Sequence, residues 1–457
     1  MYIRKITFII TVLLIVFLSI SYLSYPLVGP DSSYYLSITR EFYNGKIYFV
    51  DIATAYNPLA VIILGLPFLF FDHPDPRLSL MINMLVIWAS SYLIYSILQK
   101  INNNKKENLF YAIFFVLGSL LLDGKHIMLE PISVFFQLLG LLFYLMYKDS
   151  EKHNYLIFVG VSVALSFLSK QYGLFILAPI GIDILIHKRT ILKNSLLISI
   201  GFSLPIVLFY LYLNKNGVSI SEFINYILGK GLKLDKGNGT GINYSLTTYL
   251  TGFVLFIFYN LYLLIIPILI IKNRKKIKYM KWIFVSILPF SILVLFSASY
   301  PHYFQYVLPY AIITFAYLIY TSEIQIVKYK EVALFISTLI ISAILLFNFN
   351  KRQEKIDLQK EYVKQISSII PKKSKVYLDG ASPALYYLCH FQSIKLNTIG
   401  FTFPGYFYPQ TIVKNMEVNS YLVLTKEAYL SYKDLVSSFS KKEISFNNET
   451  YLIIKKE

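Results

Sequence analysis

The sequence contains very little cysteine, and several common motifs of ligand-binding sites are missing from it. The single cysteine, Cys389, excludes an internal disulfide and any CxxC-type metal site. No cluster of histidine and cysteine has the spacing of a zinc site. The sequence has no DxD motif, and its glycine-rich stretch 229–241 lacks the GxxxxGK[ST] order of a phosphate-binding loop. The missing DxD motif, which is typical of nucleotide-sugar binding, argues against a soluble sugar nucleotide as a substrate.

Charged residues are also scarce, at 15% of the 457 residues, whereas 56% are hydrophobic. This composition excludes a soluble enzyme, because apolar runs of about twenty residues match the hydrocarbon thickness of a bilayer. The first run follows "MYIRK" and resembles a signal peptide, but it lacks a small-residue cleavage site and many further runs follow. We therefore expect a retained membrane anchor.

Basic residues outnumber acidic ones by 43 to 25, which gives a net charge of +18. Such a charge could indicate a nucleic-acid binder. However, the lysines and arginines cluster in short loops between apolar runs, at 100–108, 187–194, 272–281 and 328–330. Cationic loops of this kind stay on the cytoplasmic side of a membrane. The charge therefore indicates topology, and we expect no nucleic-acid partner.

The apolar run 58–71 is only about fourteen residues long, which is short for a membrane span. If it lies along the outer surface, the basic loops and "MYIRK" all fall inside. This arrangement predicts about eleven transmembrane helices, at 6–28, 77–99, 108–124, 131–148, 154–169, 172–187, 194–213, 246–271, 282–299, 303–321 and 331–349. Residues 29–76 then form the first outer loop, with an interfacial helix near 32–44.

The polar tail 350–457 follows the last predicted span and is expected outside the cell. It begins with a plausible amphipathic helix that ends at Pro371. "KVYLDG", "SYLVLT" and "TYLIIK" have the pattern of short strands, and "EAYLSYKDLVSSF" has that of a helix. The predicted fold is therefore mostly α and polytopic: a membrane module of residues 1–349 with a cytoplasmic N-terminus, and a small extracytoplasmic α/β domain of residues 350–457.

Two acids, Asp31 and Glu130, lie at the outer ends of predicted spans. An ionisable group near the membrane boundary often marks a functional site. The alternative is that both are solvated interface residues. Acidity alone does not choose between them and the other acids expected outside, which are Asp51, Asp72, Asp75 and Asp123.

The stretch "PDSSYYLSITREFYNGKIYFVDIATAYNPL" (30–59) resembles the first outer loop of GT-C membrane glycosyltransferases, in the branch that contains protein O-mannosyltransferases and the aminoarabinose transferases of lipid A. Further elements of the resemblance follow in order as far as Pro309. They are Arg77 at the start of the second span, Glu130 in "LEP", Lys170 and Gln171 in an L-(T/S)-K-(Q/G) motif, and His302 and Tyr303 in "YPHYFQYVLPYAII".

The sequence departs from the family pattern at two places. Ser32 stands where the family often has a second acid, and Tyr56 and Asn57 stand where a lysine commonly precedes the prolines. A phosphate contact assigned to that lysine is therefore not carried over.

The resemblance implies the GT-C fold and a glycosyltransferase that takes a sugar from a polyprenyl-phosphate carrier and passes it to an extracytoplasmic protein, lipid or glycan. Asp31 is the expected base, because a carboxylate in reach of the acceptor hydroxyl can take its proton. Glu130 is the second catalytic candidate and would orient the acceptor. The substrate-binding candidates are Lys170, His302, Tyr303, Arg77, Arg40, Tyr34 and Gln171.

Among these candidates, Lys170, His302 and Arg77 are expected to meet the lipid phosphate, whose charge needs a nearby cation as the sugar leaves. Other readings stay open, since Arg77 and Lys170 could simply snorkel and His302 could cap an interface. No metal ligands are assigned, and a divalent cation is left open.

A different class of function is a non-catalytic polytopic membrane protein, such as a polysaccharide or lipid transporter. A transporter would more often show internal repeats or spans broken by glycine and proline near mid-membrane. The sequence shows no clear repeat, so the enzyme is favoured. The identity of the sugar, the acceptor and the linkage cannot be read from the sequence.

Overall fold

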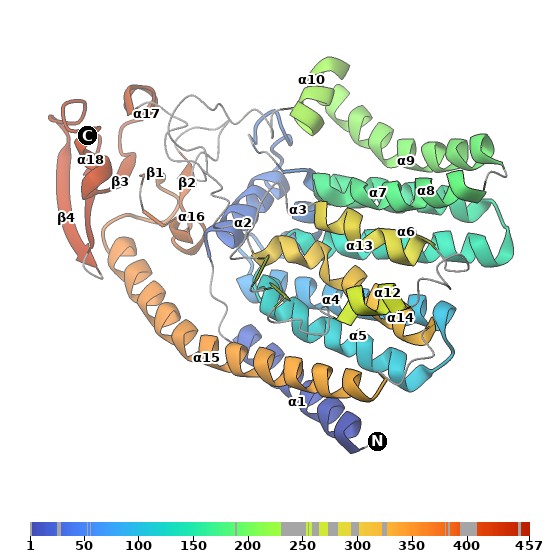
Figure 1. The fold of residues 1–457 in the computed structure, drawn as a ribbon. Coiled ribbons are helices and arrows are strands. Elements are labelled where there is room, and N and C mark those ends of the chain that lie inside the picture. Colours follow the sequence, from blue (N-terminus) through green and yellow to red (C-terminus); the bar gives the residue numbers. More distant parts are fainter. Residues whose placement is uncertain are drawn as a thin grey trace. The chain divides into compact units, whose positions relative to one another are not determined.

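The computed structural model describes residues 2–24, 29–52, 54, 56–187, 190–229, 253–254, 256–257, 265–272, 282–293, 301–321, 327–379, 381–382, 384–393, 409–446 and 449–457. These residues are mostly helical, and the named strands lie in the C-terminal part of the chain (Figure 1). Close contacts divide the chain into two compact units. Unit 1 comprises residues 1–24, 81–212 and 244–349, and unit 2 comprises residues 25–80, 213–243 and 350–457.

Unit 1 is built from apolar helices. They are α1 (Tyr2–Ser24), most of α4 (Pro76–Ile101), α5 (Lys105–Ser119), α6 (Glu130–Ser150), α7 (Asn154–Ser169), α8 (Leu177–His187), α9 (Ile191–Asn214), α12 (Ile265–Lys272), α13 (Trp282–Leu293), α14 (Leu308–Thr321) and the first part of α15 (Val327–Ser367). Short turns of other helix types continue or precede some of them: η2 (Leu120–Gly124), η3 (Gln171–Ile176) and η8 (Pro301–Tyr306).

Among the described residues, four helices are long and apolar enough to cross a membrane, namely Pro76–Ile101, Lys105–Gly124, Glu130–Ser150 and Ile191–Asn214. Shorter apolar helices occupy Phe8–Leu23, Asn154–Ser169, Gln171–Ile186 and Leu308–Tyr320. The predicted spans 246–271 and 282–299 lie partly outside the described residues. A polytopic helical protein is therefore supported, and the count of eleven spans stays a prediction.

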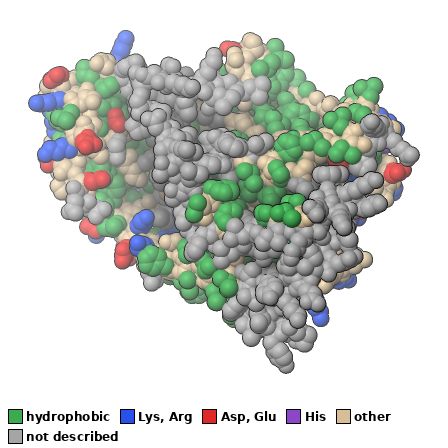
Figure 2. Space-filling model, in the orientation of Figure 1, with side chains coloured by type: hydrophobic (Ala, Val, Ile, Leu, Met, Phe, Trp, Pro, Cys, Tyr) green, Lys and Arg blue, Asp and Glu red, His purple; other side chains and the backbone are tan. Residues whose placement is uncertain are grey.

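The helix α9 carries an exposed apolar stripe, which Figure 2 shows as hydrophobic side chains gathered over this helix. Leu192, Leu196, Ile200, Leu204 and Leu208 are each more than half exposed and recur every four residues. Residues four apart lie on one face of a helix. Such a stripe suits contact with lipid chains, because contact between this apolar surface and water is unfavourable.

Unit 2 begins with the first outer loop, which contains α2 (Pro30–Tyr43), α3 (Pro58–Leu64) and the turn η1 (Leu66–Leu69). Proline opens both α2 and α3, as its fixed φ angle favours. A Cβ on Gly65, between α3 and η1, would lie 1.9 Å from Cγ2 of Thr39, so only glycine allows this close approach to α2. Segment 58–71 thus forms two short elements rather than one spanning helix. The short α10 (Ile220–Ile224) and η4 (Asn225–Gly229) also belong to unit 2.

The predicted last span and the helix predicted at the start of the polar tail are both helical, and they belong to the same helix. The structure has one continuous helix, α15, of 41 residues. The physical reason lies in the sequence between Asn350 and Ser367, which contains neither proline nor glycine, so nothing interrupts the backbone hydrogen bonds. Pro371 follows shortly after the end of the helix.

The C-terminal part of unit 2 contains a five-stranded sheet in the order β2-β1-β3-β5-β4. Its strands are β1 (Lys375–Asp379), β2 (Gln392–Ser393), β3 (Tyr421–Thr425), β4 (Ser440–Phe446) and β5 (Glu449–Lys455). β1 runs parallel to β2 and β3, whereas β5 runs antiparallel to β3 and β4. The helices α16 (Ala384–Leu388), α17 (Pro409–Asn415) and α18 (Lys426–Leu430) accompany the sheet. Its core includes Ile412, Leu422, Leu424, Tyr432 and Ile454.

The three predicted strands are present as β1, β3 and β5, but two details of the C-terminal prediction are wrong. The edge strand β4 was not predicted, because its first residues "SKKE" are all exposed and lack the apolar alternation of a half-buried strand. The expected helix in "EAYLSYKDLVSSF" is limited to α18, which has five residues and buries none of them.

A pair of histidines in unit 2 gives a prediction about acid stability. His73 lies 3.5 Å from His390, ring centre to ring centre, and stacks on Tyr387. Burial, together with the nearby His390, Arg40 and Lys372, lowers the pKa of His73 to about 4. The folded pKa lies below the unfolded value, so the unfolded state binds more protons and stability falls as the pH drops from about 6.5 toward 4.

We expect the His73→Phe variant, which keeps a ring at this position, to lose less thermal stability than the parent protein between pH 7.5 and pH 5. The difference should reach several degrees in the unfolding temperature of the detergent-solubilised full chain. Equal losses in the two proteins would contradict this explanation.

Candidate functional site

The candidate site in unit 1 begins with Glu130, the first residue of α6. Pro131 follows it and suits the first turn of a helix. The side chain of Glu130 is fully buried, and its Oε1 accepts a hydrogen bond from Nζ of Lys170. Within the part of the chain that the structure describes, Oε2 accepts no hydrogen bond. Glu130 is therefore buried beside a cation with one carboxylate oxygen still available.

Lys170 reaches Glu130 because the chain breaks between α7 and η3. Its backbone is extended, with φ −160° and ψ 143°, and it ends α7 while its N–H still donates to the carbonyl of Ser166. The side chain of Lys170 is 3% exposed, and Nζ lies 4.5 Å from the centre of the Tyr303 ring. An unpaired charge at this depth would be very costly, so the lysine and the glutamate depend on each other.

Gly173 permits this geometry by letting η3 pass close to the end of α7. A Cβ at Gly173 would lie 2.3 Å from the carbonyl carbon of Ser166 and 2.5 Å from the amide nitrogen of Phe167. Both atoms belong to the backbone and cannot rotate away. Any side chain at this position would therefore push η3, and Lys170 with it, away from α7.

We accordingly expect Gly173→Ala to destabilise the protein by about 1–3 kcal/mol, the usual range for overpacking. The matched control is Gly181→Ala in α8, because a Cβ at Gly181 would meet nothing within 4 Å. Thermal unfolding of both variants checks the expectation, and equal unfolding temperatures would show that the close approach is unimportant.

His302, in η8, lies between two carboxylates. Its Nε2 is 3.8 Å from Oε1 of Glu130, and its Nδ1 is 3.9 Å from Oδ2 of Asp123. Nζ of Lys125 lies 3.8 Å from Oδ1 of Asp123. These contacts connect Lys125, Asp123, His302, Glu130 and Lys170 in one chain of ionisable groups. We name these five residues the charged cluster.

A kinked turn positions Asp123. The turn η2 places Asp123 in the left-handed backbone region at φ 66°, which a residue with a side chain rarely adopts. Nε2 of Gln305 donates to the carbonyl of Leu122 at 2.7 Å. Nδ2 of Asn83, from α4, donates to the carbonyls of Gly124 and His126 at 3.2 and 2.8 Å. These amides fix the turn on both sides of Asp123.

Aromatic rings lie beside Lys170 and His302 of the charged cluster. Tyr303 lies edge-on to Tyr172, with 5.4 Å between ring centres, and Tyr172 lies 5.9 Å from Tyr306. Gln137 donates to the carbonyl of Tyr172 at 3.1 Å and accepts a hydrogen bond from the hydroxyl of Tyr310. Gln171 follows Lys170 in η3 and is half-buried. At the Glu130–Lys170 pair, burial among such side chains keeps water away and strengthens the interaction between the two charges.

With a neutral His302, the two ammonium groups of the charged cluster balance its two carboxylates. Protonation of His302 would give the cluster one net positive charge. Among the described residues, no group of three or more histidine, cysteine, aspartate or glutamate side chains has the geometry to hold a metal ion. The cluster can thus orient polar substrates, and it can compensate an anion once its internal pairs are exchanged or His302 is protonated.

The remaining candidates belong to unit 2. Asp31 lies in the first turn of α2 and is half-buried. The hydroxyl of Tyr34 donates to Thr54 at 3.0 Å. Arg40 is buried and donates to the carbonyls of Tyr386 and Phe391 at 3.2 and 2.7 Å, so its guanidinium joins α2 to the C-terminal part of the same unit.

Arg77 is exposed and forms an ion pair with Asp75. The site residues that were predicted from the sequence therefore lie in two different units. Unit 1 contains Glu130, Lys170, Gln171, His302 and Tyr303, and unit 2 contains Asp31, Tyr34, Arg40 and Arg77.

Sequence reasoning missed Asp123, Lys125, Asn83 and Gln305 as members of the site. Asp123 was considered among the outer acids, but nothing distinguished it from the others. The available signal was proximity along the chain, because Asp123 and Lys125 stand shortly before Glu130 and Gln305 stands three residues after His302.

The family model of dolichyl-phosphate-mannose-protein mannosyltransferases matches residues 56–224. A search of curated proteins gives no match. Solved structures with a similar fold include ArnT from Cupriavidus metallidurans in the apo state, with a TM-score of 0.67, 13% identity and 97% coverage of each chain.

A second structure of ArnT from C. metallidurans, bound to undecaprenyl phosphate, has a TM-score of 0.66 at 12% identity and covers 98% of this chain and 97% of its own. The archaeal oligosaccharyltransferase AglB from Archaeoglobus fulgidus, in complex with an inhibitory peptide and a dolichol-phosphate, has a TM-score of 0.52 at 12% identity, with 98% of this chain and 74% of that chain covered. At such identities the likeness shows the fold. The resemblance of this chain to GT-C membrane glycosyltransferases is thereby confirmed, by the family model across residues 56–224 and by the ArnT fold over nearly the whole chain.

Proposed function

We propose that the protein is an integral-membrane glycosyltransferase that moves a sugar from a polyprenyl-phosphate carrier to an extracytoplasmic acceptor. The observation that carries this proposal is the charged cluster, whose Glu130–Lys170 pair is buried at the start of the apolar helix α6 in a chain with the ArnT fold. A membrane helix rarely retains ionisable groups without a function. The ArnT structure with undecaprenyl phosphate and the AglB structure with dolichol-phosphate support a lipid phosphate as the carrier.

In the proposed reaction, the acceptor hydroxyl attacks the anomeric carbon of the sugar. A new bond forms between the acceptor oxygen and this carbon, and the bond between the carbon and the phosphate oxygen breaks. Asp31 takes the proton of the hydroxyl as the general base. The polyprenyl phosphate leaves with the electron pair, and cations beside it stabilise its charge.

The charged cluster would serve the leaving phosphate and the acceptor. His302, Lys170 and Lys125 supply hydrogen-bond donors and positive charge, and Glu130 orients Lys170 through the direct hydrogen bond between them. Tyr34 and Gln171 remain candidates for sugar contacts. Arg40 and Arg77 are weaker candidates than the sequence indicated, because the guanidinium of Arg40 donates to two backbone carbonyls and that of Arg77 pairs with Asp75.

The proposed topology places the N-terminus in the cytoplasm and residues 29–76 and 350–457 outside, with 1–349 as the membrane module. The exposed residues Lys441–Glu443 of β4 offer sites for testing it. A cysteine introduced there should react with an impermeant reagent in intact cells, while the native Cys389 is buried. Labelling only after permeabilisation would reverse the proposed topology.

The decisive experiment for the function supplies the purified full-length protein, in liposomes, with a panel of polyprenyl-phosphate-linked sugars. We expect at least one of these donors to be consumed, with release of polyprenyl phosphate. Movement of an uncleaved lipid-linked sugar across the liposome membrane would instead support a transporter, the rival function.

A further inference from the structure

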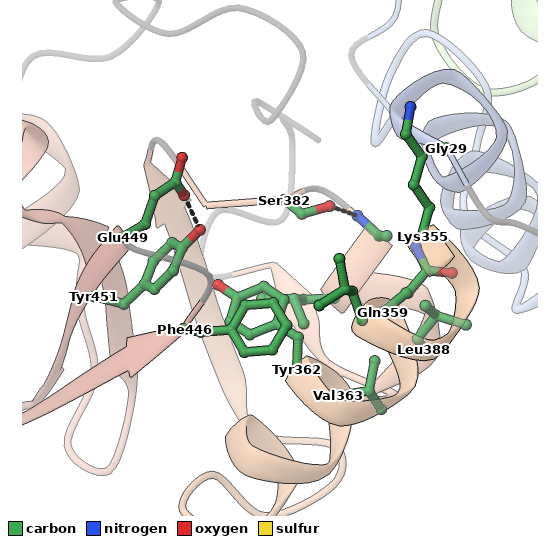
Figure 3. Close-up of a pocket in the computed structure, with 13 residues that line it drawn as sticks. Gly29, Lys355, Gln359, Tyr362, Val363, Ser382, Leu388, Phe446, Glu449 and Tyr451 are labelled. Carbon is green, nitrogen blue, oxygen red and sulfur yellow. Dashed lines mark hydrogen bonds between the residues drawn. The ribbon is translucent and has the colours of Figure 1, made fainter. Parts of the chain in front are cut away.

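Unit 2 contains a cavity that none of the proposed catalytic residues lines (Figure 3). Its volume of about 390 Å³ falls within the range of pockets that bind small molecules. Four segments of the unit form its wall. They are the C-terminal part of α15, the residues around α16, the hairpin of β4 and β5, and the single residue Gly29 before α2.

One side of the cavity is aromatic. Tyr362 stacks on Phe446, with 4.9 Å between ring centres and 14° between ring planes, and it lies 5.1 Å from Tyr451. The hydroxyl of Tyr451 donates to Glu449. Burial, followed by this hydrogen bond, raises the pKa of Tyr451 to about 12, so its hydroxyl stays protonated and uncharged. Apolar side chains of α16, such as Leu385 and Leu388, also line the cavity.

The polar groups of the cavity suit an uncharged ligand that is rich in hydroxyls. Lys355 and Gln359 lie four residues apart on the same face of α15, and Glu449 begins β5. Among the described lining residues, one ammonium and one carboxylate cancel in charge. A phosphate or an acidic peptide would find no net positive charge here, whereas neutral hydroxyl groups could donate to Glu449 and exchange hydrogen bonds with Gln359.

The cavity also lies beside the helix that carries the proposed base. Gly29 lines it and is the N-cap residue of α2, and Asp31 lies in the first turn of that helix. The backbone of Gly29 is extended, with φ −75° and ψ 174°, and a Cβ added there would meet nothing within 4 Å. The backbone two residues before Asp31 therefore borders open space.

We propose that this cavity binds a saccharide unit of the acceptor, so that the acceptor is a glycan or a glycosylated molecule rather than a bare peptide. The inference rests on the proposed function. A pyranose ring has an apolar C–H face and a rim of hydroxyl groups, which match the aromatic rings and the polar groups that line the cavity. A bound sugar would then present a neighbouring hydroxyl toward the start of α2.

The test uses the full-length protein in nanodiscs and saturation-transfer NMR with methyl glycosides and disaccharides of glucose, galactose, mannose and N-acetylglucosamine. We expect at least one of these probes to bind, and Gln359→Leu to weaken that probe by about tenfold, as loss of a polar anchor does. Gly29→Phe should also weaken it, by filling the open space beside α2. The matched control is Gln365→Leu, the same change on α15 at a residue that does not line the cavity and bonds to Glu361.

Unfolding temperatures of all variants separate weakened binding from misfolding. Binding of no saccharide, equal binding by Gln359→Leu and Gln365→Leu, or displacement of the probe by inorganic phosphate or a serine-containing tripeptide would each overturn the inference.

A kinetic measurement keeps this inference distinct from the proposed function. With a lipid-linked donor in hand, Gln359→Leu should raise KM for the acceptor and leave the affinity for the donor unchanged. The parent protein could consume the donor while Gln359→Leu has an unchanged KM for the acceptor. That result would contradict the saccharide subsite but not the proposed glycosyltransferase function. If no donor is consumed, the proposed function fails, and the acceptor role of the cavity fails with it even where a saccharide binds.

Discussion

Asp31→Asn is expected to reduce sugar transfer by about 100-fold or more, the usual scale for removing a positioned general base. The amide of asparagine has the size of the carboxylate but cannot take the proton of the acceptor hydroxyl. The folded structure should survive, because Asp31 is only half-buried and its favourable position at the N-terminus of α2 contributes about 0.3–1 kcal/mol. The affinity for the lipid-linked donor should change little.

A matched control for this variant is Asp72→Asn, in the same outer loop, because Asp72 is exposed. Initial rates of donor consumption with saturating acceptor, measured on both purified variants, make the comparison. We expect Asp72→Asn to behave like the parent protein. Near-normal turnover in Asp31→Asn would exclude Asp31 as the base and direct attention to Asp123 or Glu130, the acids of the charged cluster.

Much of the helical architecture could be predicted from the sequence, because membrane helices carry an unusually simple physical signal. A run of about twenty apolar residues is needed to cross the hydrocarbon, so the apolar runs and the charged loops between them identify α4, α6, α7 and α9 to within a few residues. The strands β1, β3 and β5 were predictable for a related reason, since each is an apolar run bounded by turn residues.

The prediction failed where local sequence does not determine the structure. The edge strand β4 is exposed along most of its length, so its sequence resembles a solvated loop, and its pairing with β5 alone makes it a strand. Hydropathy does not show the continuity of α15, because its apolar part and its polar part differ in composition, whereas helix formation requires only an uninterrupted backbone.

The sequence predicted several residues of the candidate site, but it did not predict which of them contact each other. Glu130 and Lys170 were assigned to the acceptor and to the phosphate respectively, and the structure shows them joined to each other within a buried pair. Such a contact joins residues forty positions apart, and it depends on the break at Lys170 and the close approach at Gly173. Asp123 was not assigned to the site for the same reason, because its position beside His302 arises from the kink in η2.

The Glu130–Lys170 pair gives the second large prediction. Lys170→Met should destabilise the protein by about 3–5 kcal/mol, because it leaves a fully buried carboxylate without its cation. Glu130→Gln should also be destabilised, since it leaves a buried ammonium beside a neutral amide. In the double variant Glu130→Gln/Lys170→Met, neither charge is present, and most of the lost stability should return.

The control is an exposed pair in the same chain. Lys100 and Asp149 are 2.9 Å apart, with side chains 39% and 42% exposed. Lys100→Met, Asp149→Asn and their double variant should each change the unfolding free energy by less than about 1 kcal/mol, the usual worth of a surface pair. A similar coupling energy in the two cycles would mean that burial does not strengthen the Glu130–Lys170 pair.

Transfer activity separates a structural pair from a functional one. If the pair only held α6 and η3 together, the double variant would recover activity along with its stability. We expect it to recover stability while sugar transfer stays at least about tenfold below that of the parent protein, because a methionine can neither donate to a phosphate oxygen nor be oriented by residue 130. The parent protein, the two single variants and the double variant form a double-mutant cycle. We expect the coupling energy measured from stability to differ from the one measured from sugar transfer. Recovery of both together would assign the pair to the fold alone, and the lipid phosphate would then have to be compensated by His302 and Lys125.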